Sequence, residues 1–287
     1  MTNKYEEAFS KFASMTDAQV KENVEKIISE NFDKYNTDDV KKFLISTIDL
    51  TSLNGADTEK HIIEFTGKVN DMEGEDPTIP NVAAICVYPN FVKTVKETLT
   101  AQGVNVACVS GCFPASQSFI EVKVAETALA IKDGADEIDI VLNMGAFLSD
   151  DYQTAADEIE EQRATCKNAH LKVILETGAL KEAEKIRRAS ILSLFCGADF
   201  IKTSTGKEYP GASLEAAYVM CSVLKQYKDL YGDIRGVKFS GGIRSAEEAV
   251  KYYCIVKEVL GEAWLTNKYF RIGASSLLGN LLSSISK

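Results

Sequence analysis

The feature that most constrains the fold is a regular alternation of short apolar runs with helical patterns along most of the chain. The apolar runs predict eight strands, at residues 45–51, 82–89, 104–114, 137–143, 171–177, 199–205, 234–241 and 270–274. Helical patterns lie near residues 58–70, 90–102, 117–132, 150–168, 181–196, 213–230, 245–260 and 276–285. Eight such units in series predict an α/β fold, a single (β/α)8 TIM barrel. The main alternative is a doubly wound open sheet, which would need no eighth strand.

Residues 1–40 look helical and amphipathic, and they predict an extension that packs on the body of the protein. We therefore expect an N-terminal helical extension at 1–40 and one barrel domain at 41–287. Capping sequences mark several helix starts: Thr16 with Gln19, Ser118 with Glu121, Asp150 with Gln153, and Ser245 with Glu248. Residues 71–81 contain two of the five prolines and precede a strand, which predicts a loop at the N-terminal face of the barrel.

Charge and cysteine usage exclude several classes of partner. The formal net charge is −10, whereas nucleic acids and anionic membranes are bound through clustered Lys and Arg. The polar start and the lack of 18 consecutive apolar residues predict neither a signal peptide nor a membrane span. Seven cysteines form no CxxC pair, which indicates reduced thiols and a cytoplasmic protein. His61 and His170 lack metal-site spacing, so we expect no metal.

Polar residues occupy inward-facing positions of the predicted strands, although barrel cores are otherwise apolar. Alternate strand residues point to the same side, and catalytic groups of such barrels lie at the C-terminal strand ends. This pattern selects Asp49, Thr51, Glu137, Asp139, Asn143, Lys172, Glu176, Lys202, Ser204, Lys238 and Ser240. Any single one could be a structural ion pair. Lys172 lies near the start of its predicted strand, so its long side chain could extend to solvent. Supporting or solvent-facing roles fit Thr51, Glu137 and Glu176 better than catalysis does. Cys86 fits a packed small side chain, although an inward thiol could react with an aldehyde.

Two lysines on neighbouring strands, Lys202 and Lys238, indicate a specific chemistry. A free lysine amine is almost entirely protonated at pH 7 and is then no nucleophile. Burial and a second ammonium nearby lower the pKa and expose a neutral amine. We interpret Lys202 as the nucleophile and Lys238 as its pKa-lowering partner. The alternative is that the two lysines bind two anionic groups of a substrate.

Glycine-containing loops after the last two strands predict a phosphate site. Strand 234–241 continues into Gly241-Gly242 before a helix, and strand 270–274 continues into Ser275-Ser276 before another. Barrels often hold phosphate at these loops, because glycine lets the backbone approach and helix N-termini supply N–H donors. Lys207, after the sixth strand, could form a third wall of the site.

At this point the chain closely resembles the deoxyribose-phosphate aldolase family, which are Schiff-base class I aldolases. The resemblance rests on segments 48–51, 83–89, 134–139, 176–178, 199–207 and 270–276. It implies Lys202 as the Schiff-base lysine, Lys238 as its partner and Asp139 as the proton-transfer group. The expected substrate-binding set is Asp49, Thr51, Cys86, Lys172, Thr205, Lys207, Gly241, Gly242, Gly273, Ser275 and Ser276. One departure is Phe239-Ser240, where the family usually has Pro-Ala, and we expect it to shift the loop that follows.

The resemblance implies reversible aldol cleavage of 2-deoxy-D-ribose 5-phosphate to D-glyceraldehyde 3-phosphate and acetaldehyde, as in deoxyribonucleoside catabolism. We expect no cofactor, a small-molecule sugar phosphate as the partner, no nucleic acid and no membrane; a homo-oligomer is left open. One alternative is a barrel aldolase or transaldolase that acts on a different sugar phosphate. Another is a non-catalytic sugar-phosphate sensor, which the altered Phe239-Ser240 loop makes conceivable.

Overall fold

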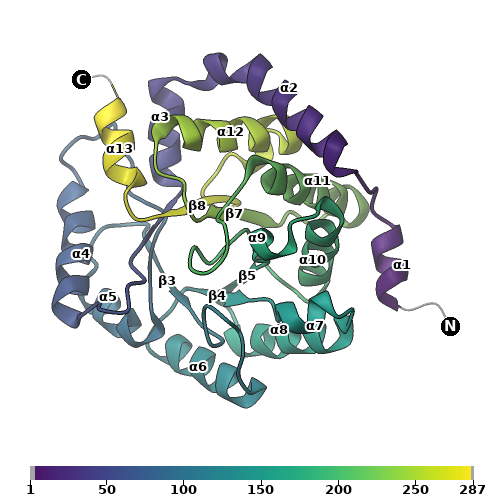
Figure 1. The fold of residues 1–287 in the computed structure, drawn as a ribbon. Helices are drawn as coiled ribbons and strands as arrows, with labels where there is room; N and C mark the ends of the chain where they lie inside the picture. The colour runs from purple at the N-terminus through teal and green to yellow at the C-terminus, as the bar shows by residue number, and fades with distance from the viewer. Residues whose placement is uncertain (1–3, 286–287) are drawn as a thin grey trace.

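The computed structural model describes residues 4–285, and within them eight parallel strands close into a barrel in chain order (Figure 1). The strands are β1 (Ile48–Thr51), β2 (Ala84–Val87), β3 (Asn105–Val109), β4 (Glu137–Val141), β5 (His170–Ile174), β6 (Phe200–Lys202), β7 (Gly236–Ser240) and β8 (Phe270–Ala274). Asp49 of β1 pairs with Gly273 of β8, which closes the sheet. The predicted (β/α)8 barrel is therefore confirmed, and the open-sheet alternative is wrong.

Helices surround the barrel and cover the outer, apolar side of its strands (Figure 1). After β1 they are α4 (Glu59–Met72), η1 (Pro89–Phe91), α5 (Val92–Thr98), α6 (Ile120–Lys132), α7 (Met144–Leu148), α8 (Tyr152–Cys166), α9 (Thr177–Leu180), α10 (Ala183–Phe195), α11 (Leu214–Tyr231), α12 (Ala246–Leu260), η2 (Glu262–Trp264) and α13 (Leu277–Ser284). The short helices η1, α7, α9 and η2 were not predicted, because three to five residues are too few to show a helical period. Residues 73–83 are largely irregular and precede β2, as expected for the loop at 71–81.

Most strands are shorter than the apolar runs that predicted them. Residues 45–46 belong to a helix rather than to β1, and β3 ends at Val109 although the run continues to residue 114. Leu142 and Leu175 follow β4 and β5 and are fully buried without extending those strands. Residues that are buried just outside a strand are also apolar, although they do not pair with a neighbouring strand. The apolar runs in the sequence therefore overestimate the lengths of the strands.

Two of the four predicted capping boxes are confirmed and two are wrong. Thr16 and Ser245 each accept from the backbone N–H three residues on, and Gln19 and Glu248 complete the boxes. α6 starts after Phe119 with no side-chain cap, and α8 is capped by Asp151, whose carboxylate accepts from Thr154 N. Asp150 has φ +61°, so the chain is still turning there and the cap falls one residue later.

Three helices precede the barrel: α1 (Lys4–Ser10), α2 (Asp17–Tyr35) and α3 (Asp38–Ser46). α2 lies along α11 and α12, and α1 lies beside α10 (Figure 1). Arg187 of α10 anchors the segment by donating to the carbonyl oxygens of Phe9 at 2.8 Å and Phe12 at 3.1 Å. α3 runs across residue 40, and the domain division at that residue stays a prediction. Residues 1–3 of the predicted extension lie outside the described residues.

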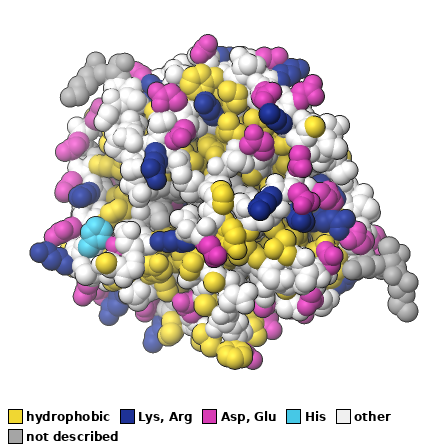
Figure 2. Space-filling model, viewed as in Figure 1, with side chains coloured by type: hydrophobic (Ala, Val, Ile, Leu, Met, Phe, Trp, Pro, Cys, Tyr) yellow, Lys and Arg dark blue, Asp and Glu magenta, His cyan; other side chains and the backbone are white. Residues whose placement is uncertain are grey.

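The surface carries charges of both signs. On the face shown in Figure 2, Lys and Arg side chains are interspersed with Asp and Glu and form no continuous basic patch. Across residues 4–285, no helix combines the length and the apolarity needed to cross a membrane.

Candidate active site

A cavity of about 250 Å³ opens at the C-terminal end of the barrel, where the loops after β1, β6, β7 and β8 meet. Its lining comprises Thr51, Leu53, Asn54, Lys202, Thr205, Gly206, Lys207, Ser240, Gly241, Gly242, Ile243, Arg244, Gly273, Ala274, Ser275 and Ser276. The wall is rich in hydroxyl groups, glycine backbone and basic side chains, and within residues 4–285 no carboxylate contributes to it. Such a lining suits a small anionic ligand.

The loop after β7 can take its shape only with glycine. Gly241 and Gly242 have φ +88° and +87°, in the left-handed region that disfavours other residues. A Cβ at Gly241 would also lie 2.9 Å from the Cα of Gly211 and 3.4 Å from that of Gly206. The backbone of this loop is therefore exposed to the cavity and packed closely against the loop after β6.

The neighbouring loop leads from β8 into α13. Ser275 and Ser276 line the cavity, and Ser276 is the N-cap residue of α13 but makes no side-chain cap hydrogen bond. The first N–H groups of that helix are therefore not used by the cap. Ser276 and Arg244 both line the cavity, so its wall offers an anion a helix N-terminus and a basic residue.

Lys202 lies at the inner end of the cavity and is 3 % exposed. It is the last residue of β6, and the register of the barrel sets Lys238 of β7 directly beside it. Its Nζ donates to Asp139 Oδ2 at 2.9 Å, and Lys238 Nζ donates to the same oxygen at 2.8 Å. Lys172 donates to the other oxygen, Oδ1, at 2.9 Å. One carboxylate of β4 thus gathers three lysines from three consecutive strands.

The two lysines at Asp139 Oδ2 differ in their titration. Burial lowers the pKa of Lys202. The negative charge of Asp139 raises this pKa and the positive charge of Lys238 lowers it further, and the net result lies below the usual value. Burial also acts against the charge of Lys238, but Asp139 and Asp49 outweigh it and hold its pKa well above the usual range. Burial opposes the charge of Asp139, yet the three lysines hold its pKa well below the usual range. Lys202 is therefore the amine that loses its proton first.

A second set of charges lies deeper in the barrel, below Asp139. Asp49 Oδ2 is 2.6 Å from Lys238 Nζ, and Asp49 Oδ1 accepts from Arg271 Nη1 at 2.6 Å. Glu137 Oε2 is 2.5 Å from Lys172 Nζ, and Glu137 Oε1 accepts from Arg271 Nη2 at 2.9 Å. All five side chains are buried. Burying this many charges is tolerable only because each has a partner at hydrogen-bond distance.

The predicted site residues fall into two groups. Those that line the cavity are Thr51, Lys202, Thr205, Lys207, Gly241, Gly242, Gly273, Ser275 and Ser276. Those that lie among the buried side chains behind it are Asp49, Cys86, Asp139, Lys172 and Lys238. The idea that Lys172 reaches solvent is wrong, because β5 already begins at His170 and the Lys172 ammonium is enclosed by Glu137, Asp139 and Asp49. Burial raises the pKa of the Cys86 thiol, which therefore stays neutral.

Several inward-facing residues do not enter the cavity. Asn143 caps α7 by accepting from Ala146 N, and it also binds Glu158. Glu176 is buried and accepts from the Thr205 hydroxyl and amide, which orders the loop after β6.

Sequence reasoning missed Leu53, Asn54, Ile243 and Arg244 of the cavity wall, and it assigned no role to Arg271. Arg271 was detectable in principle, because it is an inward polar residue of the last strand.

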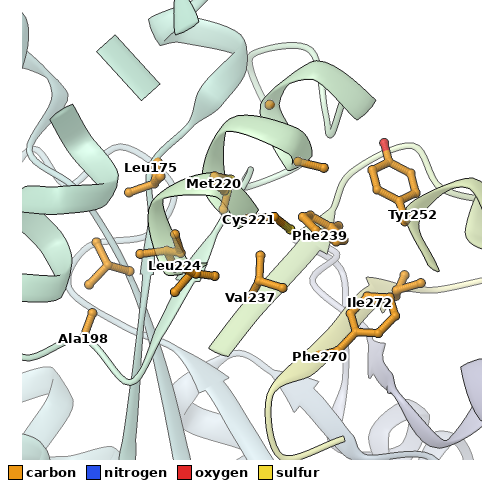
Figure 3. Close-up of a cluster of buried hydrophobic side chains, with 14 of the residues drawn as sticks. Leu175, Ala198, Met220, Cys221, Leu224, Val237, Phe239, Tyr252, Phe270 and Ile272 are labelled. Carbon is orange, nitrogen blue, oxygen red and sulfur yellow. The ribbon is translucent and has the colours of Figure 1, made fainter. Parts of the chain in front are cut away.

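The two residues of the Phe239-Ser240 departure lie on opposite faces of β7, and the expected shift of the loop that follows stays a prediction. Phe239 points outward from β7 and packs with Tyr252 and Phe270 in the layer between strands and helices (Figure 3). Ser240 points inward, and its hydroxyl donates to the Ser204 carbonyl at 2.6 Å. The hydroxyl thereby ties β7 to the loop after β6, and the aromatic ring fills the hydrophobic core.

Gly273 gives a direct test of the close packing around Lys238. A Cβ at this position would lie 3.0 Å from Lys238 Cε and 3.0 Å from Ser240 Cβ. We expect Gly273→Ala to displace Lys238, to destabilise the protein by about 1–3 kcal/mol and to lower its activity. Thermal unfolding and kcat measure the two effects. Gly279→Ala is the control, since a Cβ at that position meets nothing within 4 Å. Equal unfolding temperatures for the two variants would contradict the close packing of Gly273 against Lys238 and Ser240.

Comparison with known proteins identifies the family of this site. Residues 43–269 match the DeoC/LacD family of aldolases. The chain belongs to the DeoC/LacD aldolase family. Human deoxyribose-phosphate aldolase is 39% identical over 247 residues, which cover 83% of this chain and 78% of the human protein. A relative from Caenorhabditis elegans, whose assignment to the same enzyme is provisional, is 42% identical over 252 residues, or 87% of this chain and 82% of that protein.

A solved aldolase structure shares the fold. The deoxyribose phosphate aldolase of Aeropyrum pernix, described as tetrameric, superposes with a TM-score of 0.68 at 27% identity, covering 90% of this chain and 96% of that one. The present DeoC/LacD aldolase is thus a carbon–carbon lyase on a TIM barrel, as the sequence resemblance implied.

Proposed function

We propose that this aldolase cleaves 2-deoxy-D-ribose 5-phosphate reversibly to D-glyceraldehyde 3-phosphate and acetaldehyde through a Schiff base on Lys202. The observation that carries the proposal is the position of Lys202, a buried amine of lowered pKa at the inner end of a cavity whose wall suits a phosphate. The names of the human and worm relatives support the choice of substrate.

In the proposed mechanism the neutral Lys202 amine attacks the aldehyde carbon of the open-chain sugar, and loss of water leaves an iminium. Removal of the C3 hydroxyl proton then breaks the C2–C3 bond. The C3 fragment leaves as glyceraldehyde 3-phosphate, and the electrons of the bond move into the iminium to give an enamine. Protonation of the enamine carbon and hydrolysis release acetaldehyde and the free amine. The completed cycle regenerates the lysine, and the iminium itself accepts the electrons of the broken bond, so the proposed chemistry calls for no cofactor.

Asp139 is the proposed proton-transfer group, acting through a bound water. Its three lysine partners hold its pKa low, so the carboxylate orients the water and passes the proton on rather than retaining it. Lys238 keeps its charge beside Lys202 and favours the neutral amine. Asp139 and Lys238 can fill these two roles without contacting the phosphate.

The phosphate is proposed to sit against the loops after β6, β7 and β8. Lys207, the backbone of Gly241 and Gly242, and the serines before α13 surround that part of the cavity. They would place the sugar carbonyl near Lys202, which contributes to rate through orientation.

The proposal is tested by trapping with acetaldehyde and sodium borohydride. Reduction of the imine should add a permanent two-carbon mass to Lys202, located by peptide mass spectrometry. A protein that binds the sugar phosphate but is never trapped would be a sensor and not an aldolase. Trapping with acetaldehyde combined with no cleavage of deoxyribose 5-phosphate would point to a different sugar phosphate.

Lys207→Ala is expected to raise KM for the sugar phosphate by roughly 10- to 100-fold, because one charge-assisted contact to phosphate is lost. We expect kcat to change much less, since Lys207 lies at the wall and not at the reacting carbon. Lys268→Ala is the matched control, because Lys268 is exposed and precedes β8 at the opposite end of the barrel. A large fall in kcat with unchanged KM would place Lys207 in the chemistry instead.

The wider setting is also a proposal. A cytoplasmic role in deoxyribonucleoside catabolism follows from the proposed substrate, and a homo-oligomer is suggested by the tetrameric Aeropyrum relative. Residues 1–40 are proposed as an extension that acts in packing rather than in chemistry.

A further inference from the structure

Seven charged side chains form one connected group behind the cavity, which we call the buried ion cluster. It comprises Asp49, Glu137, Asp139, Lys172, Lys202, Lys238 and Arg271. Every member is 4 % exposed or less. Water cannot screen the members from one another, so a change in the charge of one is felt by the others.

The charges of the buried ion cluster balance only in one protonation state. It holds three carboxylates, all with lowered pKa, and four basic groups. Against burial, the acidic neighbours raise the pKa of Lys172, of Lys238 and of Arg271. Three negative and three positive charges then cancel, and Lys202 is left as the group whose protonation would give an excess charge. A net buried charge is costly, so neutrality favours the free amine.

Glu137 lies three contacts from Lys202 in the buried ion cluster, through Lys172 and Asp139, and Arg271 lies one contact farther. Arg271 bridges Asp49 and Glu137 through Nη1 and Nη2, and Glu137 also contacts Lys172. Neither residue is in contact with Lys202 or lines the cavity. Arg271 nevertheless contributes one positive charge to the buried ion cluster, and Glu137 contributes one negative charge.

We propose that Arg271 and Glu137 are positioning residues of opposite charge that together set the pH at which Lys202 becomes a nucleophile. This rests on the proposed Schiff-base function of Lys202. Removing the Glu137 charge alone would leave an excess of positive charge and favour loss of the Lys202 proton. Removing the Arg271 charge alone would leave an excess of negative charge and favour its retention. Removing both would restore the balance.

Other titratable groups face Lys202 and stay constant across these variants. Cys86 of β2 is buried and neutral, and Glu176, after β5, is hydrogen-bonded to Thr205. Asp139, Lys238, Asp49 and Lys172 complete the surroundings of Lys202 from β4, β7, β1 and β5. Because none of them is altered, opposite shifts in the two single variants can be attributed to the charges removed.

The test is the pH dependence of inactivation by acetaldehyde and cyanoborohydride, with modification located at Lys202. In Glu137→Gln we expect the half-maximal pH of trapping to fall by about one pH unit, which is a tenfold change in neutral amine. In Arg271→Met we expect it to rise by a similar amount, and in Glu137→Gln/Arg271→Met to return to the wild-type value. Arg271→Lys keeps the charge and should keep the wild-type profile, although one ammonium cannot bridge both carboxylates.

The outcomes separate this proposal from the one on which it rests. If Lys202 is never trapped at any pH, the Schiff-base function is wrong. If Lys202 is trapped but its profile is the same in Glu137→Gln and in the double variant, the positioning role is wrong. Arg271→Met leaves Asp49 and Glu137 each with one basic partner fewer, and it is the variant most at risk of not folding. If it does not fold, the comparison of Glu137→Gln with the double variant decides. A purely structural role would lower stability without moving the profile in opposite directions.

Discussion

Lys202→Ala is expected to lower kcat for aldol cleavage by on the order of 10⁴- to 10⁶-fold and to abolish trapping by acetaldehyde and borohydride. Among the described residues, Lys202 and Lys207 are the lysines that line the cavity, and Lys207 is proposed to bind the phosphate. Lys238 and Lys172 lie behind the cavity, and acidic neighbours raise their pKa values. The variant should keep its fold. It removes a buried amine whose one carboxylate partner, Asp139, keeps two further lysines.

The control for this experiment is another buried lysine. Lys123 of α6 is fully buried and pairs with Glu158 at 2.7 Å and with the Ser116 hydroxyl at 2.9 Å, away from the cavity. Lys123→Ala should destabilise the protein by about 3–5 kcal/mol through the uncompensated Glu158, yet leave trapping at Lys202 intact. Mass addition at Lys238 or Lys172 in the Lys202→Ala protein would show that the roles of the lysines have been assigned wrongly.

Asp139→Asn is expected to have the second largest effect, on stability and on rate together. Asp139 is the carboxylate shared by Lys172, Lys202 and Lys238, and its loss leaves an excess of positive charge in a fully buried site. We expect a loss of about 3–5 kcal/mol in the free energy of unfolding. The loss of proton transfer should lower kcat by roughly 10²- to 10⁴-fold. Denaturant unfolding and steady-state kinetics measure the two losses.

Asp136→Asn provides the matched comparison just before the same strand. Asp136 pairs with Lys96 at 2.8 Å, but both side chains are more than a third exposed. Solvent screens such a pair, so the expected change is within about 1 kcal/mol and kcat should be unaffected. Equal destabilisation in the two variants, or full activity in Asp139→Asn, would remove Asp139 from the centre of the proposed mechanism.

Much of the fold followed from the sequence because its signals are local. Eight apolar runs separated by helical periods predicted the eight strands of the barrel, and the capping boxes at Thr16 and Ser245 were placed correctly. Strand ends were less predictable, since Leu142 and Leu175 are apolar through burial in loops rather than through pairing. The cap of α8 moved to Asp151 because of the turn at Asp150, which composition alone does not reveal.

The candidate site divides in the same way. Alternation along each strand was enough to select Lys202, Lys238, Asp139 and Lys172 as inward residues, since period two is a property of the chain itself. This alternation could not predict how deeply each of the four side chains is buried or with which charged group each one pairs. It left open that Lys172 could reach solvent along its stem, whereas Lys172 is enclosed by Glu137, Asp139 and Asp49.

The sequence by itself therefore determined the barrel, the inward lysines and carboxylates, and the glycine loops of the cavity. Only the tertiary structure showed that the pKa of Lys202 is lowered while those of Lys172 and Lys238 are raised. Closure of β8 against β1 carries Arg271 to Asp49 and Glu137, residues that lie 222 and 134 positions away in the chain. The balance of charge in the buried ion cluster depends on those long-range contacts, because Coulomb energies follow distance in space and burial, and neither is encoded in local periodicity.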